Sequence, residues 1–184
     1  MSYLDGTSSK QSRDEYVEFY DIAHRGAVEN RINEALGFKR IIEIGSDINA
    51  SYSPADSIEG SIFIGKGEAL RYAAKRQPKA ICITDSRIDR SLIATMRDKD
   101  IVLCFGFNDL IQSTGLRRQA MLYMSGRLFA YAKRKGINIT FASLARQKNM
   151  LLSYMQLIEL AKLIGASEDH VRESIGKTTP GLIE

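Results

Sequence analysis

The stretch AICITDSRIDRSLIATMRDKDIVLCF, residues 80–105, decides the class of fold. Its two ends, residues 80–84 and 101–105, are short apolar runs rich in Ile, Val, Cys and Phe. Near-continuous runs of this kind are typical of strands in a parallel sheet that is covered on both faces. Between them, apolar side chains recur at every fourth residue, namely Ile88, Leu92 and Met96. This spacing predicts a helix with Asp85 or Ser86 as its N-cap, and hence a strand, a helix and a second parallel strand.

The same alternation extends over most of the chain. Further apolar runs of this length lie at residues 16–20, 40–44, 61–64 and 137–141. Helical patterns occur at residues 28–36, after Gly115, and in two segments near the C-terminus, the last of which opens with Ser167. Gly37 is the expected C-cap of the first of these helices. Alternating strands and helices predict a parallel α/β architecture, either an open doubly wound sheet or a barrel.

One segment interrupts this pattern. Residues 46–60, SDINASYSPADSIEG, contain turn residues without helical periodicity and are predicted to form an irregular loop. Residues 1–13 are predicted to be a disordered arm and residues 14–184 a single domain, because 184 residues with 44% apolar content suffice for one core. No apolar run reaches the roughly 20 residues of a membrane span, and the polar start lacks the centre of a signal peptide. We therefore expect a cytoplasmic protein.

Motifs of common enzyme chemistry are missing from the sequence. It contains no GxSxG, Walker A, CxxC or GxGxxG motif. Cys82 and Cys104 lie inside apolar runs, with no second Cys or His at metal-binding spacing. They are therefore predicted to be buried, reduced thiols.

Asp21, at the end of the first predicted strand, and His24 are the best candidates for acid–base or metal chemistry, with Asp47 and Asp85 at later strand ends. The other histidine, His170, falls in a C-terminal helix, so several histidines cannot gather around one metal. Carboxylates alone bind Mg²⁺ weakly without a substrate phosphate. Capping of the following helix is therefore the favoured role of this pair. No catalytic residue, metal ligand or protein-bound cofactor is predicted.

Positive charge is concentrated in one part of the chain. Between Asp109 and Glu159, 49 residues carry eight Lys or Arg and no carboxylate, so the segment is +8 while the rest sums to −4. Each cation placed against a phosphate backbone releases condensed counterions, so a nucleic acid is the expected partner. The predicted RNA-binding residues are Arg117, Arg118, Tyr123, Arg127, Lys133, Arg134, Lys135, Arg146 and Lys148.

The long predicted helix carries most of these side chains. Leu128 and Ala132 belong to its apolar stripe, whereas Tyr123, Arg127 and Arg134 lie on the opposite side. Cations and a tyrosine on one outer face suit RNA phosphates and sugars. A merely solvated surface helix is the alternative, but its i,i+4 ion pairs would require acids that the segment lacks.

Arg146 and Lys148 follow the strand predicted at residues 137–141. In parallel α/β folds, functional residues collect at the C-terminal ends of the strands. An ordinary polar loop before the next helix is the alternative interpretation of these two residues.

Several pieces of the chain, taken in order, resemble one known family. They are AICITDSRIDRSLIATMRDKDIVLCFGFNDLI at residues 80–111, RRQAMLYMSGRLFAYAKRKGINITFASLA at residues 117–145, and LIELAKLIGAS at residues 157–167. YVEFYD at residues 16–21 is similar to the first strand of that family. In order and spacing, these pieces resemble archaeal ribonuclease P protein component 3, the relative of the thirty-kilodalton eukaryotic subunit.

The resemblance implies a TIM-barrel-like α/β fold and a protein cofactor of the ribonuclease P RNA in maturing tRNA 5′ ends. In that family the RNA cleaves pre-tRNA with Mg²⁺. The protein pairs with protein component 2, in a complex with two copies of each. This chain departs from the family near residues 46–60, where about one strand–helix unit is missing, so an irregular barrel is expected. It also departs at LLSYMQ, residues 151–156, which lacks the Arg and the Pro that relatives have before the next helix.

Two other functions remain open from the sequence. A metal-dependent phosphoesterase of the polymerase and histidinol phosphatase type would share the barrel, but that superfamily relies on several metal-binding histidines. A protein-interaction scaffold would direct the same basic face toward an acidic partner instead of RNA.

Overall fold

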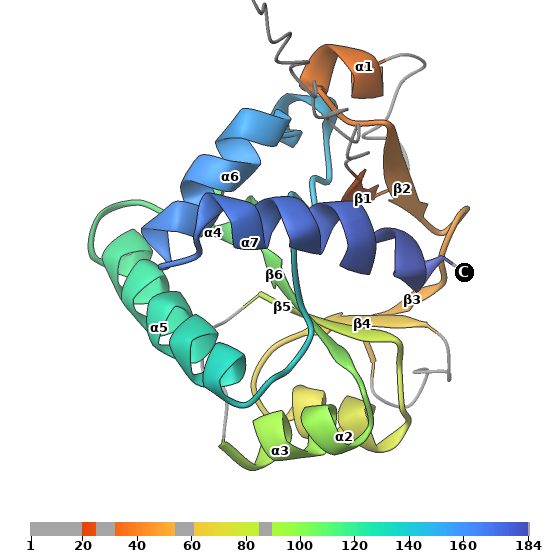
Figure 1. Ribbon diagram of the computed structural model, residues 1–184, viewed down its shortest axis with the longest axis vertical. Helices are drawn as coiled ribbons and strands as arrows, with labels where there is room; N and C mark the ends of the chain where they lie inside the picture. Colours follow the sequence, from red (N-terminus) through yellow and green to blue (C-terminus); the bar gives the residue numbers. More distant parts are fainter. Residues whose placement is uncertain (1–19, 25–31, 54–60, 85–89, 184) are drawn as a thin grey trace, which may run out of the picture.

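Parallel strands form the centre of the molecule (Figure 1). The computed structural model describes residues 20–24, 32–53, 61–84 and 90–183. A small sheet pairs β1 (Tyr20–His24) with β2 (Arg40–Ile44). The larger sheet has the order β3-β4-β5-β6-β7. Its strands are β3 (Ala50–Ser51), β4 (Ile62–Gly65), β5 (Ala80–Ile83), β6 (Val102–Gly106) and β7 (Ile139–Ala142).

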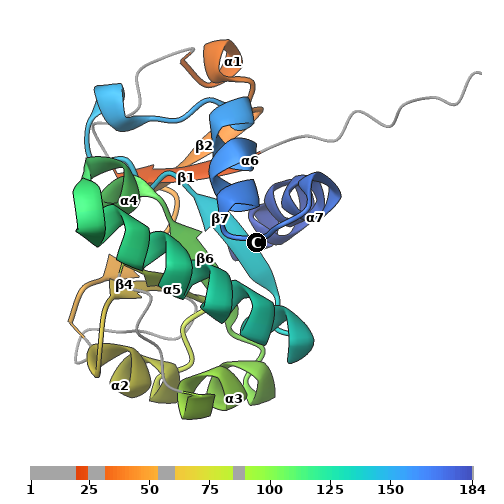
Figure 2. The same ribbon diagram turned by 90° about the vertical axis from the view of Figure 1, so that its left-hand side faces the viewer.

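Helices surround these sheets. They are α1 (Ile32–Leu36), α2 (Ala69–Lys75), α3 (Arg90–Asp98), α4 (Asn108–Gln112), α5 (Gly115–Arg134), α6 (Tyr154–Leu163) and α7 (Glu168–Glu173). Figures 1 and 2 show α2 and α3 together at one end of the molecule, α5 along its side, and α6 and α7 near β1 and β7. After α7 the chain continues as a π-helical turn (Ser174–Thr178) and a 3₁₀ turn (Pro180–Leu182).

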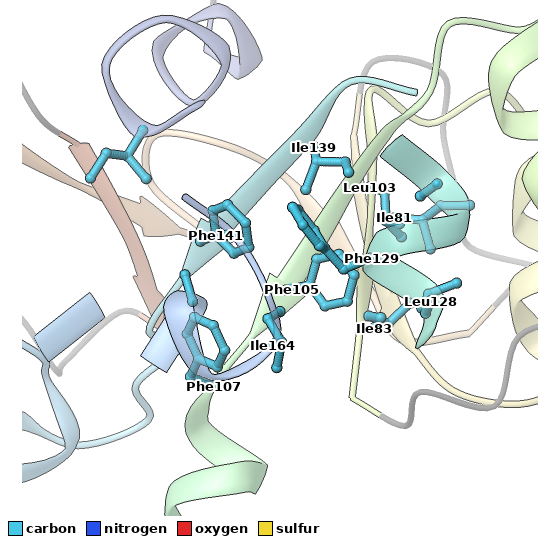
Figure 3. Packing of buried hydrophobic residues seen from close by; sticks show 14 of the residues in the cluster. Ile81, Ile83, Leu103, Phe105, Phe107, Leu128, Phe129, Ile139, Phe141 and Ile164 are labelled. Carbon is cyan, nitrogen blue, oxygen red and sulfur yellow. The ribbon is translucent and has the colours of Figure 1, made fainter. Parts of the chain in front are cut away.

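The outer faces of the strands pack against the helices in one large hydrophobic core. Leu128 and Phe129 of α5 lie against strand residues in Figure 3. The ring of Phe129 is 6.3 Å from that of Phe105 and 6.1 Å from that of Phe141, centroid to centroid. Aromatic pairs at this distance stabilise the packing beyond the area they bury. The apolar stripe predicted for the long helix is therefore the face that anchors it.

The opposite strand faces form a second core that both sheets share. Ile22 and Ile42 from the small sheet join Cys82 and Cys104 from the large one, and Leu182 from the C-terminal turn covers them. Both cysteines are buried and free, as the sequence predicted. Since one core draws on both sheets, the sheets hold each other in place through side chains rather than through one continuous ladder.

Among the described residues, isolated backbone contacts rather than a continuous ladder link the two sheets. The N–H of Leu144 donates to the carbonyl of Ile22 (2.9 Å), and the N–H of His24 donates to the carbonyl of Ala145 (2.8 Å). At the other seam, Ile44 forms an isolated parallel bridge with Ile48. The described residues therefore form a parallel α/β fold without a closed barrel, and the expected TIM-barrel-like closure is not confirmed.

Two local predictions need correction. The strand predicted at residues 16–20 lies outside the described residues except for Tyr20, and the described strand β1 (Tyr20–His24) extends four residues beyond its predicted end. Within residues 46–60, the structure places the short strand β3 beside β4, where an irregular loop was predicted. The predicted N-terminal arm, residues 1–13, lies outside the described residues. Among the described residues, no helix combines the length and the apolar character needed to cross a membrane.

Candidate RNA interface

Helix α5 presents the largest group of predicted RNA-binding residues. Its buried side is anchored by Leu128, Phe129 and Ala132, as described above. The side chains of Arg127 and Arg134 are exposed, and Tyr123 retains 64% of its accessible surface. The sequence therefore predicted correctly which side of α5 faces the solvent.

All nine predicted RNA-binding residues are exposed. Six of them lie on α5, Lys135 is the residue after its last turn, Arg146 follows β7, and Lys148 begins a 3₁₀ turn (Lys148–Met150). The structure brings some of them together. The guanidinium of Arg127 lies 5.8 Å from the ring of Tyr123. Arg118 instead donates a hydrogen bond of 2.9 Å to the carbonyl of Ile111, which holds α5 to the preceding helix α4.

A cationic cluster surrounds Tyr131, which the sequence prediction did not include. The guanidinium of Arg134 and the ammonium of Lys135 lie 5.9 and 5.7 Å from its ring. A third cation comes from α3, because the guanidinium of Arg90 is 5.9 Å from the same ring. Arg90 lies outside the acid-free segment, and only the packing of α3 beside α5 brings it to this cluster. The contact between Arg90 and Tyr131 depends on helix packing, so no signal in the sequence could have identified it.

A cleft of about 330 Å³ lies between α3 and α5. Arg90, Arg127 and Arg134 contribute to its lining, together with apolar side chains that include Ile93 and Met124. The cleft therefore combines guanidinium groups with an apolar surface, which is the chemistry needed to bind phosphates beside sugars or bases.

A second group of polar residues lies where the strands end. The hydroxyl of Tyr52 is 3.0 Å from Nδ1 of His24, and the two rings are stacked with an interplanar angle of 18°. Burial lowers the pKa of His24, and the nearby Arg146 guanidinium lowers it further. The pocket here, which Asn108 and Arg146 help to line, has a volume of only about 10 Å³. It has room for a water molecule, not for a nucleotide.

Asp21 does not cap a helix, contrary to the prediction. It lies within β1 and is fully buried. Its Oδ1 atom accepts hydrogen bonds from the backbone N–H groups of Ile22 (2.8 Å) and Ser143 (2.7 Å). Burial raises the pKa of its carboxyl from 3.8 to about 6, although these hydrogen bonds oppose the shift. This carboxylate therefore forms part of the junction between β1 and β7.

The other candidate metal ligands do not gather around Asp21. Asp47 accepts hydrogen bonds from Arg40 (2.5 Å) and from the N–H of Glu43 (2.9 Å), which closes the turn after β2. His170 lies on α7, and its ring contacts Phe129 at 5.6 Å. Asp85 lies outside the described residues. Within the described ranges, no three His, Cys, Asp or Glu side chains are placed to share a metal ion.

Comparison with known proteins gives one informative result, and it concerns the fold. No protein-family profile and no curated protein sequence matches the chain. Among solved structures, a chain in the cryo-EM structure of archaeal ribonuclease P with mature tRNA is similar to it, with a TM-score of 0.62 and 14% sequence identity. The alignment covers 92% of this chain and 82% of that chain. The chain thus shares its overall fold with a chain of archaeal ribonuclease P, solved together with mature tRNA.

Proposed function

We propose that this chain is an RNA-binding protein subunit of ribonuclease P and assists the 5′-end maturation of pre-tRNA. One observation carries the proposal. A fold similar to a chain of archaeal ribonuclease P presents an exposed, acid-free helix α5 with its arginines directed outward. The similar fold and the basic helix are both needed, because a shared fold does not determine function and a basic helix does not identify its partner.

The role proposed within that complex is stabilisation of the catalytic RNA. Guanidinium and ammonium groups along α5 would neutralise RNA phosphates and release their counterions. The RNA, with Mg²⁺ bound to it, would perform the cleavage, as in the protein component 3 family that the sequence resembles. By the same resemblance, protein component 2 is the proposed protein partner, in a complex with two copies of each.

The test is cleavage of pre-tRNA by an archaeal ribonuclease P RNA at limiting Mg²⁺. Three reactions are compared: RNA alone, RNA with protein component 2, and RNA with component 2 and this chain. Cleavage that requires this chain supports the proposal. If a full-length component 3 stimulates cleavage and this chain does not, the proposal is wrong. Binding to a stoichiometric acidic protein, without RNA binding, would identify the scaffold function instead.

A further inference from the structure

The cleft between α3 and α5 has guanidinium groups and apolar side chains in its lining. The guanidinium groups can bind an anionic part of a ligand, and the apolar side chains can contact an uncharged part. Arg90 approaches from α3, while Arg127 and Arg134 approach from α5. Among residues 20–24, 32–53, 61–84 and 90–183, none of these three arginines forms an ion pair with a carboxylate. Each of the three guanidinium groups can donate hydrogen bonds to an anionic ligand such as a phosphate.

Tyr131 holds two of these arginines in position. Its ring is half-buried at the junction of the two helices and lies 5.9 Å from the guanidinium carbon of both Arg90 and Arg134. A cation near an aromatic ring is attracted by the ring's quadrupole, so the ring favours positions of both guanidinium groups beside the cleft. Two guanidinium groups from different helices therefore lie beside one ring at the cleft.

The apolar part of the lining favours a ligand that carries a sugar or a base over a simple phosphate ion. Ile93 and Leu128 are buried beneath the cleft, and Met124 is half-buried on its wall. The accessible surface of Met124, together with that of Ala130, can contact a sugar or a base but offers no hydrogen bond to a phosphate. At about 330 Å³ the cleft lies at the lower end of the size range of small-ligand sites. That size suits one nucleotide better than a duplex, whose bases are stacked and unavailable.

We infer that the α3–α5 cleft binds one unpaired nucleotide of an RNA, with phosphates on Arg90 and Arg134 and the sugar and base against the apolar lining. This inference rests on the proposed RNA-binding function and makes it more specific. It assigns a binding role to Arg90 and a positioning role to Tyr131, neither of which is among the nine predicted RNA-binding residues.

The experiment compares two fluorescent RNA duplexes of equal length, one fully paired and one with a single unpaired nucleotide, in titrations with the full chain. The unpaired nucleotide should strengthen binding roughly tenfold, in line with the gain from placing one exposed base against a protein surface. Arg90→Ala should remove most of that preference. It should also reduce the magnitude of the slope of log K against log salt concentration by about one. Tyr131→Leu should also reduce the preference, whereas Tyr131→Phe keeps the ring and should retain it.

Arg97→Ala is the matched control. Arg97 lies on the same helix α3 but outside the cleft, where it pairs with Asp98 at 2.7 Å. This variant should bind both RNAs like the wild type. Equal wild-type affinity for the two duplexes, or a preference that survives Arg90→Ala, would overturn the inference while leaving RNA binding intact. If the wild type binds neither RNA, nor the ribonuclease P RNA, the proposed function itself fails.

Discussion

The Oδ1 atom of Asp21 accepts a hydrogen bond of 2.7 Å from the backbone N–H of Ser143, across 122 residues of sequence. In the described part of this junction, the backbone links the two sheets through the hydrogen bonds of Leu144 and His24. The carboxylate thus acts as an additional acceptor where β1 meets the end of β7. A buried charge in this position is unfavourable even when hydrogen-bonded, because the bonds replace only part of its lost hydration.

Asp21→Asn should stabilise the protein above the pKa of Asp21. The folded-state pKa of about 6 exceeds the usual 3.8, so the ionised carboxyl destabilises the fold above pH 6, and this penalty disappears as the pH falls toward 3.8. The difference between these two pKa values corresponds to a penalty of about 3 kcal/mol at most in the free energy of unfolding. Asparagine still offers an oxygen to Ser143 but carries no charge. Urea unfolding should show the gain at about pH 8 and little gain at about pH 4.

The matched variant is Asp21→Ala, which removes the charge but also leaves the Ser143 N–H without this acceptor. It should be less stable than Asp21→Asn by about 1–3 kcal/mol. Equal stability of Asp21→Asn and wild type at both pH values would contradict the assigned charge penalty.

The role of Asp21 could not be predicted from sequence, because it depends on Ser143 and on the sheet junction. An aspartate after an apolar run resembles a strand end, whereas the actual strand continues to His24. The same limit applies to Arg90 and Tyr131, which only helix packing brings together. In contrast, the faces of α5 follow from local periodicity, so its buried and exposed sides were predictable.

A double charge reversal on α5, Arg127→Glu with Arg134→Glu, should weaken RNA binding without unfolding the protein. Both side chains are exposed, so their replacement leaves the core unchanged. Affinity should fall by at least about tenfold, and the slope of log K against log salt should become shallower. Fluorescence anisotropy at several salt concentrations measures both quantities, and a thermal melt verifies folding.

The control for this double variant is Lys66→Glu with Arg76→Glu, which changes the net charge equally. Lys66 and Arg76 are also exposed and flank α2 in the sequence. Figures 1 and 2 show α2 apart from α5. If both double variants lose the same affinity, net charge rather than the face of α5 determines RNA binding.

Arg146→Gln should raise the pKa of His24. Burial is the main cause of the lowered pKa of this imidazole, and the positive charge of Arg146 is the second. Removing that charge should bring the pKa closer to its ordinary value without restoring it fully, because the burial remains. An NMR titration of the histidine ring protons measures the change. His170 serves as an internal reference, since its lowered pKa depends on burial and Lys133 instead. A shift of both histidines, or of neither, would contradict the assignment.

Ser153→Ala should destabilise the fold but leave RNA affinity unchanged. The segment LLSYMQ, which lacks the Arg and Pro of the similar family, contains a capping box at the start of α6. Ser153 Oγ accepts from the N–H of Gln156 (3.3 Å), and Gln156 Oε1 accepts from the N–H of Ser153 (2.8 Å). Losing such a cap costs about 1 kcal/mol.

A double-mutant cycle with Gln156→Ala should give less than the sum of the two single effects, because both side chains complete one motif. Reduced RNA affinity at a temperature where Ser153→Ala remains folded would instead mean that this turn contacts RNA directly, as a substitute for the missing Arg.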